Sequence, residues 1–249
     1  MSLKIKILFV FSIIFFVMGL LIGLFLWTGS VWADLEGYMF QPATYAERAK
    51  ESLQCPNLIT SSDFGVISMG FENPYDRNLK LVVRGNKTLG FLIYVATDEN
   101  VFELKPGESK VVHWYIYPED AVWNRFVLFR ANIISSYGSS LSTASCGVMV
   151  IKFPFLNSNQ FFLLALLLGT LLIGSGVFLM YRSSILSRKH NYYNEKLMLA
   201  LTTVLIIGLL LGLFGQWVAG GLLLIGMYIF ILMTIANILQ KIGDKPKAF

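Results

Sequence analysis

The sequence predicts an α+β membrane protein with four transmembrane helices and an extracytoplasmic immunoglobulin-like β-sandwich inserted between helices one and two. The first observation is four long segments without any charged residue or histidine, at 7–27, 161–181, 197–214 and 218–239. About 20 helical residues cross a hydrocarbon layer about 30 Å thick. The second observation is the long polar segment after the first of these, which holds both cysteines. We therefore expect an anchor at 1–33, an outer domain at 34–156 and a three-helix region at 157–249.

The first apolar segment also has the layout of a secretory signal. Lys4 and Lys6 precede the apolar run, and Ala33 stands where a signal peptidase reads a small residue. The apolar run at 7–27 is longer than a signal core, which typically has about 7 to 15 residues. We expect an uncleaved signal anchor. Cleavage after Ala33 is the alternative, and it would leave three spans with the domain still outside.

Orientation follows from the distribution of charge. Nine Lys or Arg residues and two acidic residues lie in three short pieces: the N-terminus, the 182–196 connection and the tail after 239. The outer segment carries eleven Lys or Arg residues and thirteen acidic residues. Lys and Arg near the ends of spans are retained in the cytoplasm. We therefore expect both termini in the cytoplasm, residues 34–156 outside and the plasma membrane as the location. The excess positive charge is spread over three short pieces and is not gathered on one folded face, which argues against a nucleic-acid partner.

The outer segment reads as a succession of β-strands. They are expected at 64–71, 79–84, 89–96, 110–117, 126–134 and 144–153, which are rich in Val, Ile, Phe and Tyr. Turn-forming residues fill the breaks, including 84–87. Short strands at this spacing favour a two-sheet sandwich. Before them, residues 42–54 predict a short helix with proline in its first turn.

Alternation along the 110–117 segment predicts which side chains face the core. Val112, Trp114 and Ile116 occupy every second position, and His113 and Tyr115 lie between them. Successive side chains of a strand point to opposite faces. We therefore expect the first three in the core and the other two on the outer face.

Three short segments carry a family resemblance. The run 71–74, the turn 104–109 and the terminal strand around Cys146 resemble the strand and turn pattern of extracytoplasmic immunoglobulin-like and fibronectin-type sandwich domains. The resemblance covers the outer domain only. It implies a sandwich fold, and it assigns no functional residue.

The two cysteines and one sequon are the candidate modification sites. Cys55 and Cys146 lie near the two ends of the outer domain, where an oxidising compartment favours a disulfide. A metal pair is the alternative, but it lacks further ligands at suitable spacing. Asn86 begins the triplet Asn-Lys-Thr and is a candidate glycosylation site in an expected turn.

Aromatic residues of the outer domain form a candidate contact patch, made of Tyr115, Tyr117, Trp123 and Phe126. Packing in the core and its rim is the alternative interpretation of these four. Trp27 stands at the end of the first span and is expected as an anchor at the membrane interface.

Small residues four apart occur in three of the apolar segments. The pairs are Gly19 with Gly23, Thr170 with Gly174, and Gly208 with Gly212. Such spacing lets helices approach closely in lipid, where apolar burial gives no preference for protein over lipid. We expect these residues to pack the helices against each other or against another membrane subunit.

The sequence contains few residues in patterns that support catalysis. It shows no nucleophile elbow, phosphate loop or zinc signature, and its two histidines, His113 and His190, lie far apart. The spans contain no ionisable group for an ion path. We expect a protein that is not an enzyme and has no cofactor, with lipids and either other membrane subunits or a second copy as partners. An accessory or structural subunit is the expected function, and a small transporter or channel component is the alternative.

Overall fold

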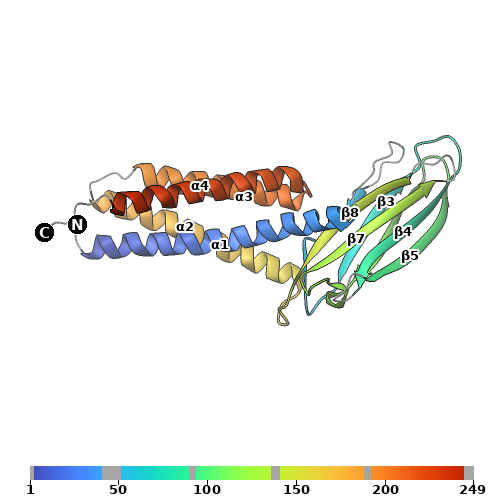
Figure 1. Ribbon diagram of the computed structural model, residues 1–249, viewed down its shortest axis with the longest axis horizontal. Coiled ribbons are helices and arrows are strands. Elements are labelled where there is room, and N and C mark those ends of the chain that lie inside the picture. The colour runs from blue at the N-terminus through green and yellow to red at the C-terminus, as the bar shows by residue number, and fades with distance from the viewer. Residues whose placement is uncertain (1–2, 41–51, 90–93, 136–140, 188–191, 244–249) are drawn as a thin grey trace. The chain divides into compact units, whose positions relative to one another are not determined.

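The computed structural model describes residues 3–40, 52–89, 94–135, 141–187 and 192–243 (Figure 1). It divides the chain into two compact units, one of residues Met1–Thr28 and Ala165–Phe249 and the other of Gly29–Leu164. The first unit is helical and the second contains all the strands of the described chain.

In the part of the chain that the structure describes, four helices are long and apolar enough to cross a membrane. They are α1 (Leu3–Phe40), α2 (Ser158–Ser187), α3 (Tyr192–Leu213) and α4 (Trp217–Gly243). Helices α1, α2 and α4 each contain one of the four uncharged segments of the sequence, and α3 contains the segment 197–214 except for its last residue. Helix α1 is longer than the sequence predicts: it has 38 residues and continues well beyond the apolar run at 7–27. At 1.5 Å per residue it is about 57 Å long, almost twice the thickness of a hydrocarbon layer.

The strands form two sheets of a β-sandwich-like region (Figure 1). The three-stranded sheet has the order β1-β3-β6 and the five-stranded sheet the order β2-β8-β7-β4-β5. Their bounds are β1 (Ser52–Gln54), β2 (Leu58–Thr60), β3 (Gly65–Glu72), β4 (Leu79–Leu89), β5 (Tyr94–Leu104), β6 (Ser109–Ile116), β7 (Phe126–Ser135) and β8 (Leu141–Ile151). All described pairings are antiparallel except that of β2 with β8. A short 3-10 helix, η1 (Pro118–Asp120), follows β6.

An apolar core of described residues lies between the two sheets. Every second residue of β3, β4, β6 and β7 enters it, as expected for half-buried strands. Across the core, Trp114 packs on Phe129 with ring centroids 5.0 Å apart, and Phe71 packs on Phe102 at 5.5 Å. The alternation expected along β6 is confirmed, because Val112, Trp114 and Ile116 are buried while the intervening residues are exposed.

Three local expectations are wrong. The strand expected at 89–96 is divided, because Leu89 ends β4 and Tyr94 begins β5, which continues to Leu104; residues 90–93 lie outside the described part of the chain. The turn expected at 84–87 is absent, because β4 runs unbroken from Leu79 to Leu89 and pairs with β5 and β7 through this stretch. Cross-strand pairing on both sides outweighs the turn preference of Gly85 and Asn86. The helix expected at 42–54 fails at its end, where residues 52–54 form β1; residues 42–51 lie outside the described part of the chain.

Candidate interaction surface

The end of α1 beyond the apolar run is part of the sandwich unit. Ala33 lies against Gly147 of β8, Gly37 lies against the backbone of Cys146, and Gly29 lies against the Met149 side chain. These three α1 residues are four apart, so they share one face of the helix. Sequence reasoning missed this face, although its spacing of small residues is the same as that of Gly19 and Gly23.

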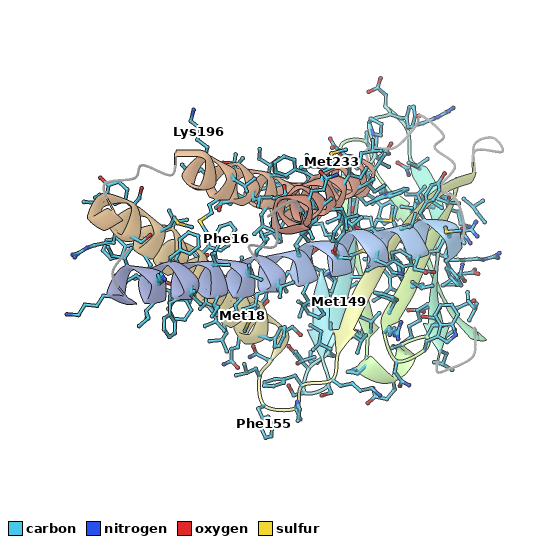
Figure 2. All side chains as sticks on the ribbon, turned by 60° about the vertical axis from the view of Figure 1, so that its left-hand side comes forward. Phe16, Met18, Met149, Phe155, Lys196 and Met233 are labelled. Atoms are coloured by element: carbon cyan, nitrogen blue, oxygen red, sulfur yellow. A yellow bond between two sulfur atoms is a disulfide. The ribbon has the colours of Figure 1, made fainter. Side chains whose placement is uncertain are left out.

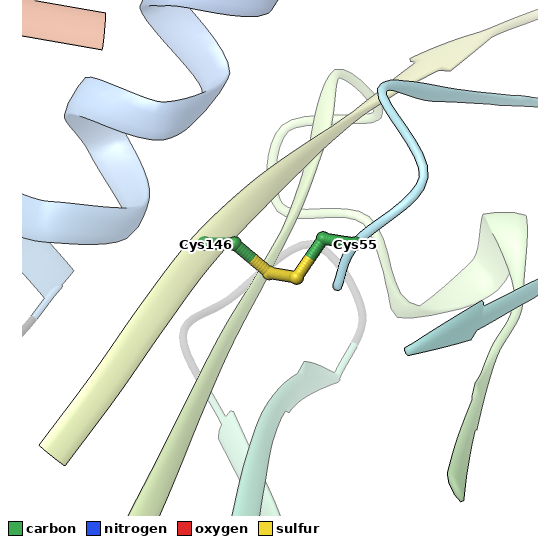
Figure 3. Close-up of a disulfide and its surroundings, with 2 residues drawn as sticks. All are labelled: Cys55 and Cys146. Carbon is green, nitrogen blue, oxygen red and sulfur yellow. A yellow bond between two sulfur atoms is a disulfide. The ribbon is translucent and has the colours of Figure 1, made fainter. Parts of the chain in front are cut away.

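The disulfide lies beside this helix contact. Cys55 and Cys146 are bonded and enclose a loop with a sequence separation of 91 residues (Figure 3). Cys146 lies on β8 and is buried, and Cys55 packs against the same apolar core. The bond therefore ties the segment between β1 and β2 to the strand that α1 covers.

The first turn of α2 is held by the sandwich. Asp63 Oδ2 accepts a hydrogen bond from the Ser158 backbone N–H at 3.2 Å. The Thr60 backbone N–H donates to Ser158 Oγ at 3.1 Å, and the Thr60 hydroxyl donates to the Leu156 carbonyl oxygen at 2.8 Å. A carboxylate at the first N–H of a helix satisfies an otherwise unpaired donor and complements the helix dipole. The start of α2 is thus fixed to the loop between β2 and β3.

Exposed aromatic rings surround this end of the sandwich. Phe64, next to Asp63, packs against Tyr115 and Tyr117 with ring centroids 5.9 and 6.2 Å apart. Their exposed fractions are 50%, 55% and 47%, so the three rings form an apolar surface open to the surroundings. Two of the residues in the expected contact patch, Tyr115 and Tyr117, therefore do lie together.

Behind this surface lies an ion pair. Lys87 Nζ is 2.8 Å from Asp120 Oδ2 and 5.4 Å from the centroid of the Tyr117 ring. Asp120 is 4% exposed, and its carboxylate also accepts the Tyr117 backbone N–H at 2.8 Å. A nearly buried carboxylate with two donors holds the strand end in place. The pair supports the position of Tyr117.

Trp123 is presented by an unusual turn. Trp123 and Asn124 have φ angles of 51° and 55°, in the left-handed region that L-residues rarely adopt. The turn is closed by Val122, whose backbone N–H donates to the Phe126 carbonyl oxygen at 2.8 Å. Trp123 is 48% exposed, whereas Phe126 is half-buried, so Phe126 belongs to the packed edge of the sandwich.

The loop between β8 and α2 carries the most exposed aromatic ring among the described residues of this unit. Phe155 is 82% exposed, and Figure 2 shows it at the tip of the loop, pointing away from the ribbon. Phe153 packs against both Phe155 and Phe161, with centroids 5.7 Å apart in each case. The exposed ring is thus supported from behind by other aromatic residues.

Two polar residues of β7, the buried Arg130 and the half-buried Asn132, lie on the outer face of the five-stranded sheet. Arg130 is only 8% exposed, and its Nε has no hydrogen-bond partner among the described residues; the same holds for Asn132 Oδ1, two positions along β7. Desolvation lowers the pKa of Arg130 below its ordinary value. On the neighbouring strand, Asn86 accepts a hydrogen bond from the Thr97 hydroxyl at 2.9 Å.

The candidate glycosylation triplet lies inside β4. Asn86 is half-buried, and Thr88, its third residue, is fully buried. The Thr88 hydroxyl donates to the Asp120 carbonyl oxygen and accepts the Leu128 backbone N–H, at 3.1 and 3.0 Å. The triplet is therefore part of the packed sandwich and does not form a turn.

The small residues of the helical unit divide into two groups. A Cβ added to Gly19 would lie 2.8 Å from the Gly169 carbonyl oxygen, and one added to Gly23 would lie 2.6 Å from Leu205. Gly208 lies against the ring of Trp27. Trp27 is completely buried, so the expectation of an interface anchor is wrong; the ring fills the space that Gly208 leaves open.

The remaining small residues make fewer contacts. Thr170 is exposed, and its hydroxyl donates to the Leu166 carbonyl oxygen of its own helix at 2.8 Å. No described atom lies within 4 Å of a Cβ built on Gly174. Gly212 is buried at the end of α3, where its carbonyl oxygen accepts the Gly215 backbone N–H at 3.1 Å.

The described residues contain no group of three or more His, Cys, Asp or Glu arranged to hold a metal ion. His113 is exposed on the outer face of β6, opposite Ser68 of β3. His190 lies outside the described residues. The exposed aromatic rings around one end of the sandwich are the candidate interaction surface.

Comparisons with known proteins leave the family open. No family model and no curated protein matches the chain. Among solved structures, the CARDB domain of a Pyrococcus furiosus protein in complex with di-metal ions is similar over 44% of this chain and 100% of its own, at 14% identity and a TM-score of 0.34. A β-glucosidase from Listeria innocua in complex with glucose is similar over 42% of this chain, at 15% identity and a TM-score of 0.31. The chain spans 16% of the length of that enzyme. A likeness of this size assigns no activity.

Proposed function

We propose that this chain is a non-catalytic accessory or structural subunit of a membrane complex, inserted by four helices with its sandwich outside the cytoplasm. Four candidate spans and a disulfide together suggest a membrane protein with an oxidising extracytoplasmic part. The excess of Lys and Arg on the short connecting pieces supports placing both termini in the cytoplasm.

An uncleaved first helix is part of the proposal. Signal peptidase acts on a small residue in an accessible segment, but Ala33 lies inside α1, is 1% exposed and packs against Gly147. Removing α1 at this residue would uncover the β8 surface that it contacts. This argument supports the signal anchor over the cleaved alternative.

The observation that carries the proposed function is the open small-residue face of α2. Gly19, Gly23 and Gly208 are used within the chain, whereas Thr170 and Gly174 are exposed, are four apart and leave room beside the helix. Small residues at this spacing favour helix association in lipid. We assign this face to a helix of another membrane subunit.

Co-purification from the native membrane tests the assignment. We expect stoichiometric membrane subunits to accompany the wild-type chain in mild detergent, and to be lost in the variant Gly174→Leu, which fills the open face. The matched control is Leu168→Phe, on another side of α2 about 120° away, where the side chain is already 48% exposed. The control is expected to retain the partners.

The outcomes separate the two candidate functions. Retention of all partners by Gly174→Leu would show that this face is not the contact. A wild-type chain that purifies alone would contradict the accessory role. Substrate flux in proteoliposomes that contain only this chain would then support the transporter or channel alternative.

A further inference from the structure

We propose that the exposed aromatic residues at the α2 end of the sandwich insert into the outer headgroup layer of the membrane. These residues, named the aromatic rim here, are Phe64, Tyr115, Tyr117, Trp123 and Phe155. The proposal rests on the membrane insertion of α2 proposed above. It assigns three of the four residues of the expected contact patch, Tyr115, Tyr117 and Trp123, to lipid, where the sequence alone suggested a protein partner.

The first step is that four separate segments converge on one end of the domain. Phe64 follows Asp63, which binds the first N–H of α2. Tyr115 pairs with Val66, one residue after the start of β3. The turn that carries Trp123 is attached to β8 near its end, because the Val150 backbone N–H donates to the Arg125 carbonyl oxygen at 2.7 Å. Phe155 is in the loop that leads from β8 into α2.

The second step is the depth at which this end must lie. The candidate span of α2, Ser158–Ile185, has 28 residues and is about 42 Å long. This equals the hydrocarbon layer of about 30 Å together with its two headgroup regions. Ser158 therefore lies at the outer interface. Phe155 is only three residues away, which is at most about 10 Å of chain.

The third step is the chemistry of the residues. The five rings are between 47% and 82% exposed, which is costly in water for so much apolar surface at one end of a domain. Tyr and Trp beside a span match the aromatic belts of membrane interfaces, and Phe is among the residues that interfacial apolar surfaces bury at the headgroup boundary. Arg125 and Lys152 are exposed on the same segments and suit phosphate groups, while Asp63 and Asp120 are engaged by Ser158 and Lys87. Glu119 is the exposed carboxylate of η1.

Quenching by brominated lipids tests the proposal in the full-length chain reconstituted into phosphatidylcholine vesicles. The fluorescence of Trp123 is obtained as the difference in emission between the wild type and Trp123→Phe. The fluorescence of a tryptophan at position 155 is obtained as the emission that Phe155→Trp adds to the wild type. We expect both signals to lose most of their emission when bromine is near the top of the acyl chains. The control Val111→Trp lies on the same sheet face as Tyr115 but six residues from Tyr117, about 20 Å away, and should not be quenched.

A second control separates this proposal from the proposed membrane insertion. Leu171 of α2 is 70% exposed, so Leu171→Trp should be quenched by deeply brominated lipid if α2 spans the membrane. Failure of that control would reject the insertion and the rim proposal with it. If Leu171→Trp is quenched while Trp123 and Phe155→Trp respond only to aqueous iodide, the rim faces water and the proposal is wrong. Protection from both quenchers would mean that protein covers the rings, which also overturns it.

Discussion

Gly37 of α1 and Gly147 of β8 approach so closely that a Cβ added to Gly37 would lie 2.6 Å from the Gly147 backbone nitrogen. The obstacle is backbone, which cannot rotate away as a side chain can. The contact therefore requires glycine, and it joins the extended end of α1 to the outer face of the five-stranded sheet. The N-terminal helix, which the sequence predicts to be a membrane anchor, is therefore also a part of the sandwich unit at its C-terminal end.

We expect Gly37→Ala and Gly147→Ala each to destabilise the sandwich unit by about 1–3 kcal/mol, because each added methyl group overlaps backbone atoms. Thermal unfolding of the full chain in detergent would measure the change. Gly174→Ala is the control, since no described atom lies within 4 Å of its Cβ. Equal stability of all three variants would mean that α1 does not contact β8 in this way.

Reduction of the Cys55–Cys146 bond should lower the free energy of unfolding by about 4–5 kcal/mol, because it frees a loop with a sequence separation of 91 residues. The double variant Cys55→Ser, Cys146→Ser should behave like the reduced protein. Unfolding with and without a reducing agent would measure the difference. A reduced protein as stable as the oxidised one would contradict this expectation.

Asp120→Ala should lower the free energy of unfolding by about 2–3 kcal/mol, because it leaves Lys87 Nζ and the Tyr117 backbone N–H without their shared acceptor. Asp120→Asn keeps an acceptor oxygen and should cost less. Chemical unfolding of both variants would compare them. The prediction fails if the asparagine variant is as unstable as the alanine variant.

Arg130→Met should leave stability unchanged or raise it by about 1–2 kcal/mol. Arg130 is 8% exposed, its guanidinium is desolvated, and its Nε lacks a hydrogen-bond partner in the described part of the chain, so an apolar side chain of similar size removes the cost of burying this charge. Leu81→Ala is the comparison, because this core residue is 2% exposed and its truncation should cost about 2–5 kcal/mol. If Arg130→Met destabilises the protein as much as Leu81→Ala does, the guanidinium binds a stabilising group.

Gly208→Leu should disrupt the helical unit, because its side chain would occupy the position of the Trp27 ring. Gly226→Leu is the matched control: it is also a helical glycine, and no described atom lies within 4 Å of its Cβ. Thermal aggregation in detergent would compare the two variants. We expect only Gly208→Leu to aggregate at a lower temperature. Trp27→Ala combined with Gly208→Leu should recover part of the loss, since the smaller residue makes room.

The amino-acid sequence by itself determined the local features of this protein. Apolar segments without charge give four helices long enough to span a membrane, because each residue contributes to the pattern independently of its neighbours in space. Alternation along β6 gave the correct buried face. The sequence predicts that the two cysteines of the 34–156 segment pair, and the structure joins them.

The tertiary structure alone decided the features that depend on residues far apart in the chain. Trp27 fits an interface anchor by its position, but packing against Gly208 buries it completely. The continuation of α1 to Phe40 depends on β8, more than 100 residues later, and Gly85 stays in a strand because β5 and β7 pair on both sides. Likewise, the aromatic rim exists only where the fold brings four segments together. No local pattern carries such information, because close packing is a property of surfaces that meet in space.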